Sequence, residues 1–200
     1  MIQVKPITIG IDATNLRQGG GVTHLVELLR AAQPELHGID RIVVWGGTPI
    51  LNALDDRPWL AKRSHVALEK GFLQRTIWQC FRLSKAARDS ECKVLFVPGS
   101  SYIGNFHPVV TMSQNLLPFE MSELRRYGWT LLALKLLLLR ITQSHTFKST
   151  DGVIFLTKYA LDAVLKVTGK FRGQTCIVPH GLNPRFKMAP KLQRDIASYD

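Results

Sequence analysis

Apolar and polar residues alternate at the start of the chain, and the pattern then changes to a helical period. Ile7, Ile9 and Ile11 alternate with more polar neighbours, which is the period of a β-strand. Gly19–Gly21 follow on a short polar loop, and apolar residues then recur at helical spacing at Val22, Leu25, Val26, Leu28 and Leu29. Residues 7–29 are therefore predicted to form a strand, a glycine turn and a helix, the first half of a βαβ unit.

Strand-like and helix-like segments alternate along the rest of the chain. Short, mostly apolar runs predict further strands at residues 41–46, 64–68, 94–98, 109–113, 152–157 and 175–179. Helices are predicted at 71–88, 122–148 and 158–168, with a short helix and loop over 50–63. Apolar strands alternating with helices are typical of a parallel sheet that is covered on both faces. The sequence thus predicts an α/β fold.

Polar residues gather where the predicted strands end. In a parallel sheet, ligands bind beyond the carboxyl ends of the strands. The loops expected at that edge are Asn15 to Thr23, Gly99 to Tyr102, Gln114 to Glu120 and His180–Gly181. We expect these four loops to converge on one site.

Two helical segments have a distinctive composition. The helix at 71–88 is predicted to bury an apolar side and to expose a basic one; the apolar side comprises Phe72, Leu73, Ile77, Cys80 and Phe81, and the basic residues are Arg75, Arg82, Lys85 and Arg88. The segment Trp129–Ile141 is the most hydrophobic in the chain, interrupted by Lys135 and Arg140. It is either a core helix with two snorkelling cations or a surface that docks on an anionic membrane.

The glycine loop is a candidate anion site. A helix start leaves backbone N–H groups unpaired and carries the positive end of the helix dipole. Gly19, Gly20 and Gly21 let that backbone approach a ligand without a Cβ in the way. The loop is neither G-x-G-x-x-G nor a P-loop. The alternative is a tight strand-to-helix turn that binds nothing.

Individual polar residues are weaker candidates. Asp12 ends the first strand beside the glycine loop, where its carboxylate can orient a ligand hydroxyl or cap a turn. His180 ends a strand at the expected ligand edge and is a better candidate base than His24, one turn into the first helix. The histidines lack metal-ligand spacing and G-x-S-x-G is absent, so neither a metal site nor a serine hydrolase is predicted.

Charge and composition limit the classes of partner that are expected. The 200 residues are 46% hydrophobic and 20% charged, with a formal charge of +11, which predicts attraction to anionic ligands or an anionic membrane. Basic and aromatic residues are not interleaved, so nucleic acid is not expected. Three scattered cysteines and no signal-peptide pattern favour the cytoplasm.

Four segments resemble a known family when taken in order. They are GIDATNLRQGGGVTHLVELLR, VVTMSQNLLPFE, DGVIFLTKYALDAVL and IVPHGLNPRF. Together they are similar to the N-terminal domain of GT-B glycosyltransferases of the GT4 (group 1) family, and the resemblance covers almost the whole chain. It implies a Rossmann-like domain over residues 1–186, half of a GT-B fold, with 187–200 a linker or the start of a C-terminal domain.

The resemblance also implies an activity. A sugar would pass from a nucleotide-sugar, as co-substrate, to a polysaccharide or lipid-linked acceptor, with retention and without a metal or other cofactor. Gly19–Gly21 would approach the donor diphosphate, and Gln114 and Asn115 would stand in the catalytic position. The acceptor side of the cleft would comprise Asp12, Asn15, Thr23, Ser100, His180 and Gly181.

Two departures from the family pattern qualify this implication. Many members carry His-Asp where this chain has Gln114-Asn115; an amide pair still hydrogen-bonds sugar hydroxyls but does not exchange a proton. The family's donor-binding domain, with its E-x7-E motif, would begin after Phe186. Two rivals therefore remain open: a non-catalytic sugar- or phosphate-binding module or split-enzyme subunit, and a nucleotide-dependent oxidoreductase.

Overall fold

The computed structural model describes residues 7–128, 130–181 and 187. The predicted linker, except Lys187, and Trp129 lie outside the described residues. The chain forms one seven-stranded sheet in the order β3-β2-β1-β4-β5-β6-β7, and every neighbouring pair is parallel. The strands are β1 (Ile7–Asp12), β2 (Ile39–Trp45), β3 (Leu60–Arg63), β4 (Cys92–Val97), β5 (Val109–Ser113), β6 (Gly152–Phe155) and β7 (Gln174–Ile177).

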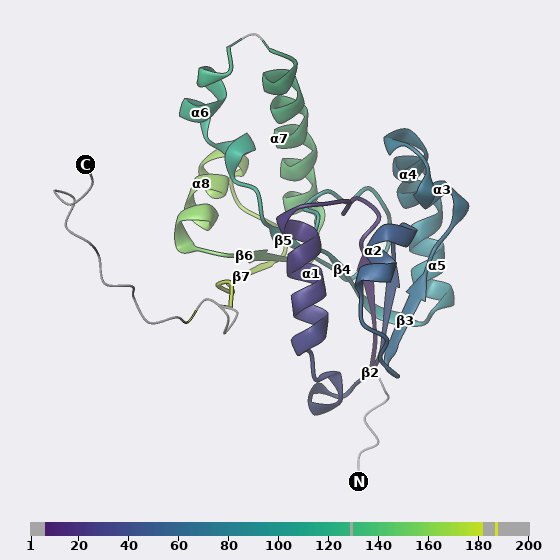
Figure 1. The fold of residues 1–200 in the computed structure, drawn as a ribbon. Coiled ribbons are helices and arrows are strands. Elements are labelled where there is room, and N and C mark those ends of the chain that lie inside the picture. The colour runs from purple at the N-terminus through teal and green to yellow at the C-terminus, as the bar shows by residue number, and fades with distance from the viewer. Residues whose placement is uncertain (1–6, 129, 182–186, 188–200) are drawn as a thin grey trace, which may run out of the picture.

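Helices connect most of these strands. They are α1 (Gly20–Ala31), η1 (Pro34–His37), α2 (Thr48–Ala53), α3 (Val66–Glu69), α4 (Phe72–Trp78), η2 (Gln79–Leu83), α5 (Ser84–Asp89), η3 (Leu117–Phe119), α6 (Met121–Arg126), α7 (Leu131–Ser149) and α8 (Lys158–Thr168). Figure 1 shows α1 crossing one face of the sheet and the α6–α7 hairpin projecting away from it.

The sheet is packed on both faces, as the alternating strand pattern predicts. In β2, Val43 and Trp45 belong to a core cluster with residues of α3, α4 and α5, whereas Val44 belongs to a second cluster with α1 and α2. Successive strand residues point to opposite faces, so the two clusters lie on opposite sides of β2. A third cluster joins α7 and α8 to β6. The predicted α/β architecture with a parallel, Rossmann-like sheet is confirmed.

One predicted strand is wrong. Residues 64–68 were expected to be extended, but β3 lies earlier, at Leu60–Arg63, and Val66–Glu69 form the short helix α3. His65 caps that helix, because its Nδ1 accepts a hydrogen bond from the backbone N–H of Ala67 at 3.1 Å. The cap stabilises a helical turn where β-propensity alone favours a strand.

The helix predicted at 71–88 is present, but its buried side was assigned wrongly. α4, a π-helical turn (η2) and α5 follow one another without a break over residues 72–89. Arg75, Trp78 and Gln79 face the core, whereas Leu73, Ile77 and Phe81 are 66%, 50% and 76% exposed. At about 100° per residue these two sets lie on opposite sides of the helix. The segment thus presents its apolar stripe to solvent.

The core-helix interpretation of Trp129–Ile141 is also wrong for most of the segment. Within α7, only Leu136 of this stretch is fully buried; the exposed apolar residues are Leu131, Leu132, Leu134, Leu137, Leu138 and Ile141. α7 packs on the sheet through its C-terminal half, where Phe147 is 0% exposed. The N-terminal half stands with α6 beyond the sheet (Figure 1).

Candidate functional site

The strand order changes direction between β1 and β4. From β1 the chain moves to β2 and β3 on one side, and it then returns to β4 on the other. The loops after β1 and β4 therefore diverge at their carboxyl ends, which is the switch point where open α/β sheets bind ligands. These loops carry Asp12 and Gly19–Gly21 on one side and Gly99–Ser101 on the other.

The glycine loop leads directly into α1. Gly19 has φ +80°, a left-handed conformation that favours glycine, and its carbonyl accepts from the N–H of Val22 at 3.1 Å. A Cβ added to Gly20 would meet no heavy atom within 4 Å, so open space adjoins this helix start. Among the first four N–H groups of α1, those of Val22 and Thr23 donate to the carbonyl of Gly19, so those of Gly20 and Gly21 are the ones without a helical partner. The loop thus has the geometry that an anion cradle requires.

Gln114 lies beside this loop, although it follows a different strand. A Cβ built at Gly21 would lie 3.3 Å from Gln114 Oε1 and 3.0 Å from Leu16 Cδ2. The end of β5 and the start of α1 are therefore in contact range through the Gln114 amide. The next residue, Asn115, uses its Oδ1 to accept from the N–H of Leu117 at 3.1 Å. Gln114 faces the glycine loop, and Asn115 also shapes its own turn.

Asp12 lies in a buried polar cluster below the loop. Its Oδ1 accepts from the N–H of Thr14 at 3.0 Å, and its Oδ2 accepts from Gln79 Nε2. Gln79 Nε2 also donates to the carbonyl of Ser101 at 3.2 Å, which joins the loops after β1 and β4. Burial raises the pKa of Asp12, and the hydrogen bonds from Thr14 and Gln79 oppose that rise. Asp12 therefore helps to hold together the loops that follow β1 and β4.

His180 and His24 form a pair on one side of α1. Their ring centroids are 4.9 Å apart in an edge-to-face arrangement. His24 Nε2 is buried without a hydrogen-bond partner. Burial lowers the pKa of His24, and the nearby His180 lowers it further. The fold thus brings the end of the described chain back to the first helix, as expected from the convergence of the loops.

The remaining predicted cleft residues differ in accessibility. Thr23 is exposed on α1, and Gly181 is exposed after His180. Ser100 is 3% exposed, and its hydroxyl donates to the carbonyl of Met112, so it links the end of β4 to β5. Asn15 is half-buried, and its Oδ1 has no partner. Thr23 and Gly181 are thus accessible to a ligand, whereas Ser100 is buried and stabilises the carboxyl edge of the sheet.

Sequence reasoning missed two arginines near the same loop. Arg75 was assigned to a solvated helix face, yet it is 9% exposed and its Nη1 contacts the carbonyl of Thr14 at 3.5 Å. Arg17 Nη2 donates to the carbonyls of Leu68 and Lys70, both at 2.9 Å. The i, i+4 spacing of Arg75 and Gln79, with Trp78 between them, was the only signal for an inward polar stripe.

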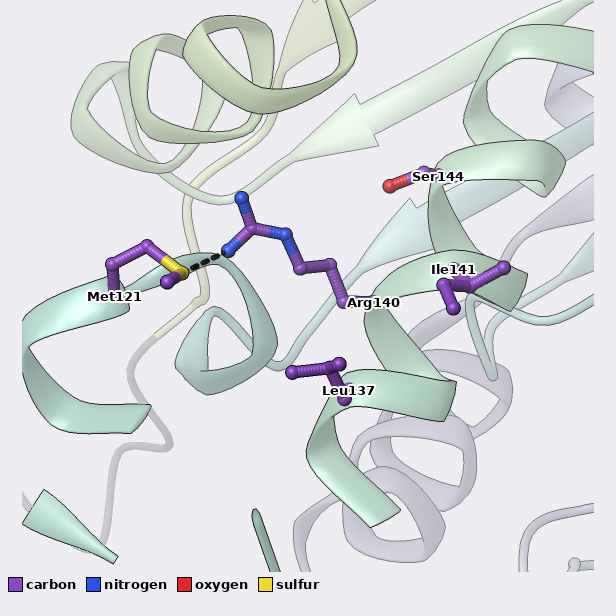
Figure 2. Close-up of a pocket in the computed structure, with 5 residues that line it drawn as sticks. All are labelled: Met121, Leu137, Arg140, Ile141 and Ser144. Atoms are coloured by element: carbon purple, nitrogen blue, oxygen red, sulfur yellow. Dashed lines mark hydrogen bonds between the residues drawn. The ribbon is translucent and has the colours of Figure 1, made fainter. Parts of the chain in front are cut away.

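Two apolar grooves lie on the α6–α7 hairpin. One of about 770 Å³ is lined mainly by Met121, Leu124, Leu131, Leu134 and Leu137. Another of about 420 Å³ is lined by Met121, Leu137, Arg140, Ile141 and Ser144. Figure 2 shows Arg140 extending from α7 toward the sulfur of Met121 on α6. Both grooves thus combine an apolar lining with an arginine (Arg125 in the larger one).

Within the part of the chain that the structure describes, no cluster of three or more His, Cys, Asp or Glu side chains is arranged to hold a metal ion. Among the described residues, no helix is both long and apolar enough to span a bilayer.

No protein-family model and no curated protein matches this sequence. The fold and the geometry of the carboxyl edge therefore carry the functional argument.

Proposed function

We propose that this chain is the acceptor-side domain of a GT4-type GT-B glycosyltransferase. It would take part in transferring a sugar from a nucleotide-sugar to a polysaccharide or lipid-linked acceptor. The observation that carries the proposal is the open space at Gly20, at the switch point of the sheet and beside Gln114. A diphosphate would be favoured there, because backbone N–H groups and the dipole of α1 are directed at that space.

The glycine loop and Gln114 would have different roles in the reaction. Negative charge develops on the leaving diphosphate as the bond to the sugar breaks, and N–H groups at the start of α1 would stabilise it. Gln114 would hydrogen-bond a sugar hydroxyl through its amide, without exchanging a proton. The reaction would need no metal in this scheme. A second, donor-binding domain would supply the other contacts to the nucleotide.

The α6–α7 hairpin supports a membrane-bound acceptor. It follows β5, so it projects from the same edge of the sheet as the glycine loop. Its exposed leucines have no partner in the described residues, and residues 121–149 contain five Lys and Arg against one acid, Glu123. Apolar side chains bury in the acyl region while cations pair with anionic headgroups. We propose that the hairpin docks on the anionic, cytoplasmic face of a membrane.

Sugar transfer by the full-length gene product tests the proposed function. A panel of nucleotide-sugars, each labelled in the sugar, is incubated with a cell extract of lipids and polysaccharides. We expect one donor to lose its label to the extract and to release a nucleoside diphosphate. If acceptor binds but no donor is consumed, the chain is a binding module; NAD(P) binding without sugar transfer would instead identify an oxidoreductase.

Vesicle co-sedimentation tests the docking surface separately. The protein is mixed with vesicles of phosphatidylglycerol and phosphatidylcholine, or of phosphatidylcholine alone, at low salt. Binding only to the anionic vesicles, weakened by added salt, is the expected result. No binding at low salt would rule out the membrane partner and leave the transferase proposal standing.

A further inference from the structure

Arg75 is a buried cation without a counter-charge. It lies one turn into α4 with only 9% of its surface exposed. Its one hydrogen bond runs from Nη1 to the carbonyl of Thr14 at 3.5 Å, and its Nε has no partner. No described carboxylate forms an ion pair with it. A buried guanidinium normally pairs with an anion, because taking it out of water otherwise costs free energy.

The surrounding residues add positive charge and leave polar atoms unused. Burial lowers the pKa of Arg75, and repulsion from Arg17 in the β1–α1 loop lowers it further. The carboxylate of Asp12 is already engaged by Thr14 and Gln79. Thr14 Oγ1 and Asn15 Oδ1, in the loop that Arg75 contacts, are buried without partners. The contact region of α4 and the β1–α1 loop therefore has unused hydrogen-bonding groups and, among the described residues, no carboxylate paired with its arginines.

We propose that Arg75 and the Thr14 hydroxyl, with Arg17 at the rim, bind an oxyanion, a phosphate or carboxylate group. An oxyanion supplies the missing counter-charge and accepts from the Arg75 guanidinium in the paired geometry that arginine favours. This site is distinct from the glycine cradle, because Trp78 and Leu83 of the same continuous helix pack on one face of the sheet and α1 packs on the other.

If the chain has the proposed function, on which this step rests, the oxyanion site indicates the chemical class of the acceptor. The donor diphosphate would occupy the glycine cradle, so a second oxyanion site at the same edge would receive an acidic group of the acceptor. We infer an acceptor that carries a phosphate or a uronic-acid carboxylate near the hydroxyl that receives the sugar.

Binding of small anions to the full chain tests the site without any sugar nucleotide. Inorganic phosphate and acetate are titrated separately by calorimetry and thermal shift, with sodium chloride holding the ionic strength constant. The variants are Arg75→Met, Gly20→Ala and, as a matched control, Arg82→Met, since Arg82 is exposed on the same continuous helix. The stronger of the two anions identifies phosphate or carboxylate as the bound group.

We expect Arg75→Met to weaken anion binding at least tenfold, while Arg82→Met and Gly20→Ala keep this site. In chloride alone, Arg75→Met should melt at the same or a higher temperature, because the uncompensated charge is gone. Arg75→Lys should bind with intermediate affinity. Equal anion binding by Arg75→Met and the unmodified chain would overturn the proposal. Failure of sugar transfer alone would overturn the proposed function and leave this site intact.

Discussion

Helices α1 and α7 are both rich in leucine, yet they lie in opposite environments. In α1, Leu25 and Leu29 are 0% and 4% exposed, one turn apart on the side that faces the sheet. In the N-terminal half of α7, leucine occupies nearly every position, and Leu131 is 87% exposed. A helix in a two-layer fold buries only one stripe. Because leucines occur on all sides of α7, most of them cannot be buried against the sheet.

This difference shows that period, rather than apolar content, predicts burial. α1 alternates its leucines with Thr23, His24 and Glu27, so one side is polar and the other enters the core. α7 has no polar side near its start, and helices of that kind are buried in large cores or in lipid. The hairpin is outside the core of this sheet, which favours lipid as its second environment.

The largest expected effect is a difference in protein stability between a substitution in α1 and one in α7. Leu25→Ala should lower the free energy of unfolding by about 3 kcal/mol, because the side chain is fully buried and leaves a cavity. Leu131→Ala should change it by less than about 0.5 kcal/mol, as expected at an exposed site. Urea denaturation of both variants measures the contrast. Similar losses for the two would mean that the hairpin tip is packed after all.

The next effect is a difference in membrane affinity between substitutions at two exposed leucines. Leu131→Gln should weaken binding to anionic vesicles by about tenfold, since burying one leucine contributes about 1.5 kcal/mol or more. Leu36→Gln is the control: Leu36 is 71% exposed, but it lies on η1, which leads into β2 at the opposite edge of the sheet. Vesicle co-sedimentation measures both. An equal loss for Leu36→Gln would argue against docking through the hairpin.

A smaller effect sharpens the account of the glycine loop. Gly19→Ala should cost about 1 kcal/mol of stability, because φ +80° strains any residue with a Cβ. Gly20→Ala should be neutral or stabilising by up to about 1 kcal/mol, since it begins the helix in open space. Thermal unfolding of the two variants gives the comparison. A loss for Gly20→Ala as large as that for Gly19→Ala would mean that the space at Gly20 is filled.

The smallest effect concerns the histidine pair. The pKa of His24 is lowered from 6.5 in the folded chain, so the unfolded chain binds the proton first as pH falls. This contribution is absent well above pH 6.5 and destabilises the folded chain progressively as pH falls below 6.5. His24→Gln should flatten that decline. Urea titrations at pH 8 and pH 5 measure it, and an unchanged slope would show that His24 titrates normally.

Much of the fold could be predicted from the sequence, because period-2 and period-3.6 patterns report which residues face a core. β1, α1, β5 and α8 appear within two residues of where their patterns place them. The failures occur where one local preference competes with another. His65 caps a turn that has strand propensity, and Leu73, Ile77 and Phe81 form a stripe that the sheet does not cover.

The candidate site was predictable only in part. Glycines at a strand end and polar residues after other strands point to the carboxyl edge, because parallel topology brings strand ends together. The closeness of Gln114 to Gly21 depends on the order of β1, β4 and β5, which the linear pattern does not fix. Arg75 was missed because an arginine on a helix is normally exposed, and only its burial against Thr14 reveals its role.

The most direct test of the central claim is the rate of sugar transfer by Gly20→Ala. The full-length gene product carries this change, and Glu35→Ala, on the exposed turn before β2, is the control. The account predicts at least a tenfold lower transfer rate for Gly20→Ala, with an unchanged or higher melting temperature, because the new methyl group occupies the diphosphate space. Full transfer activity in Gly20→Ala would contradict the claim that this loop holds the donor.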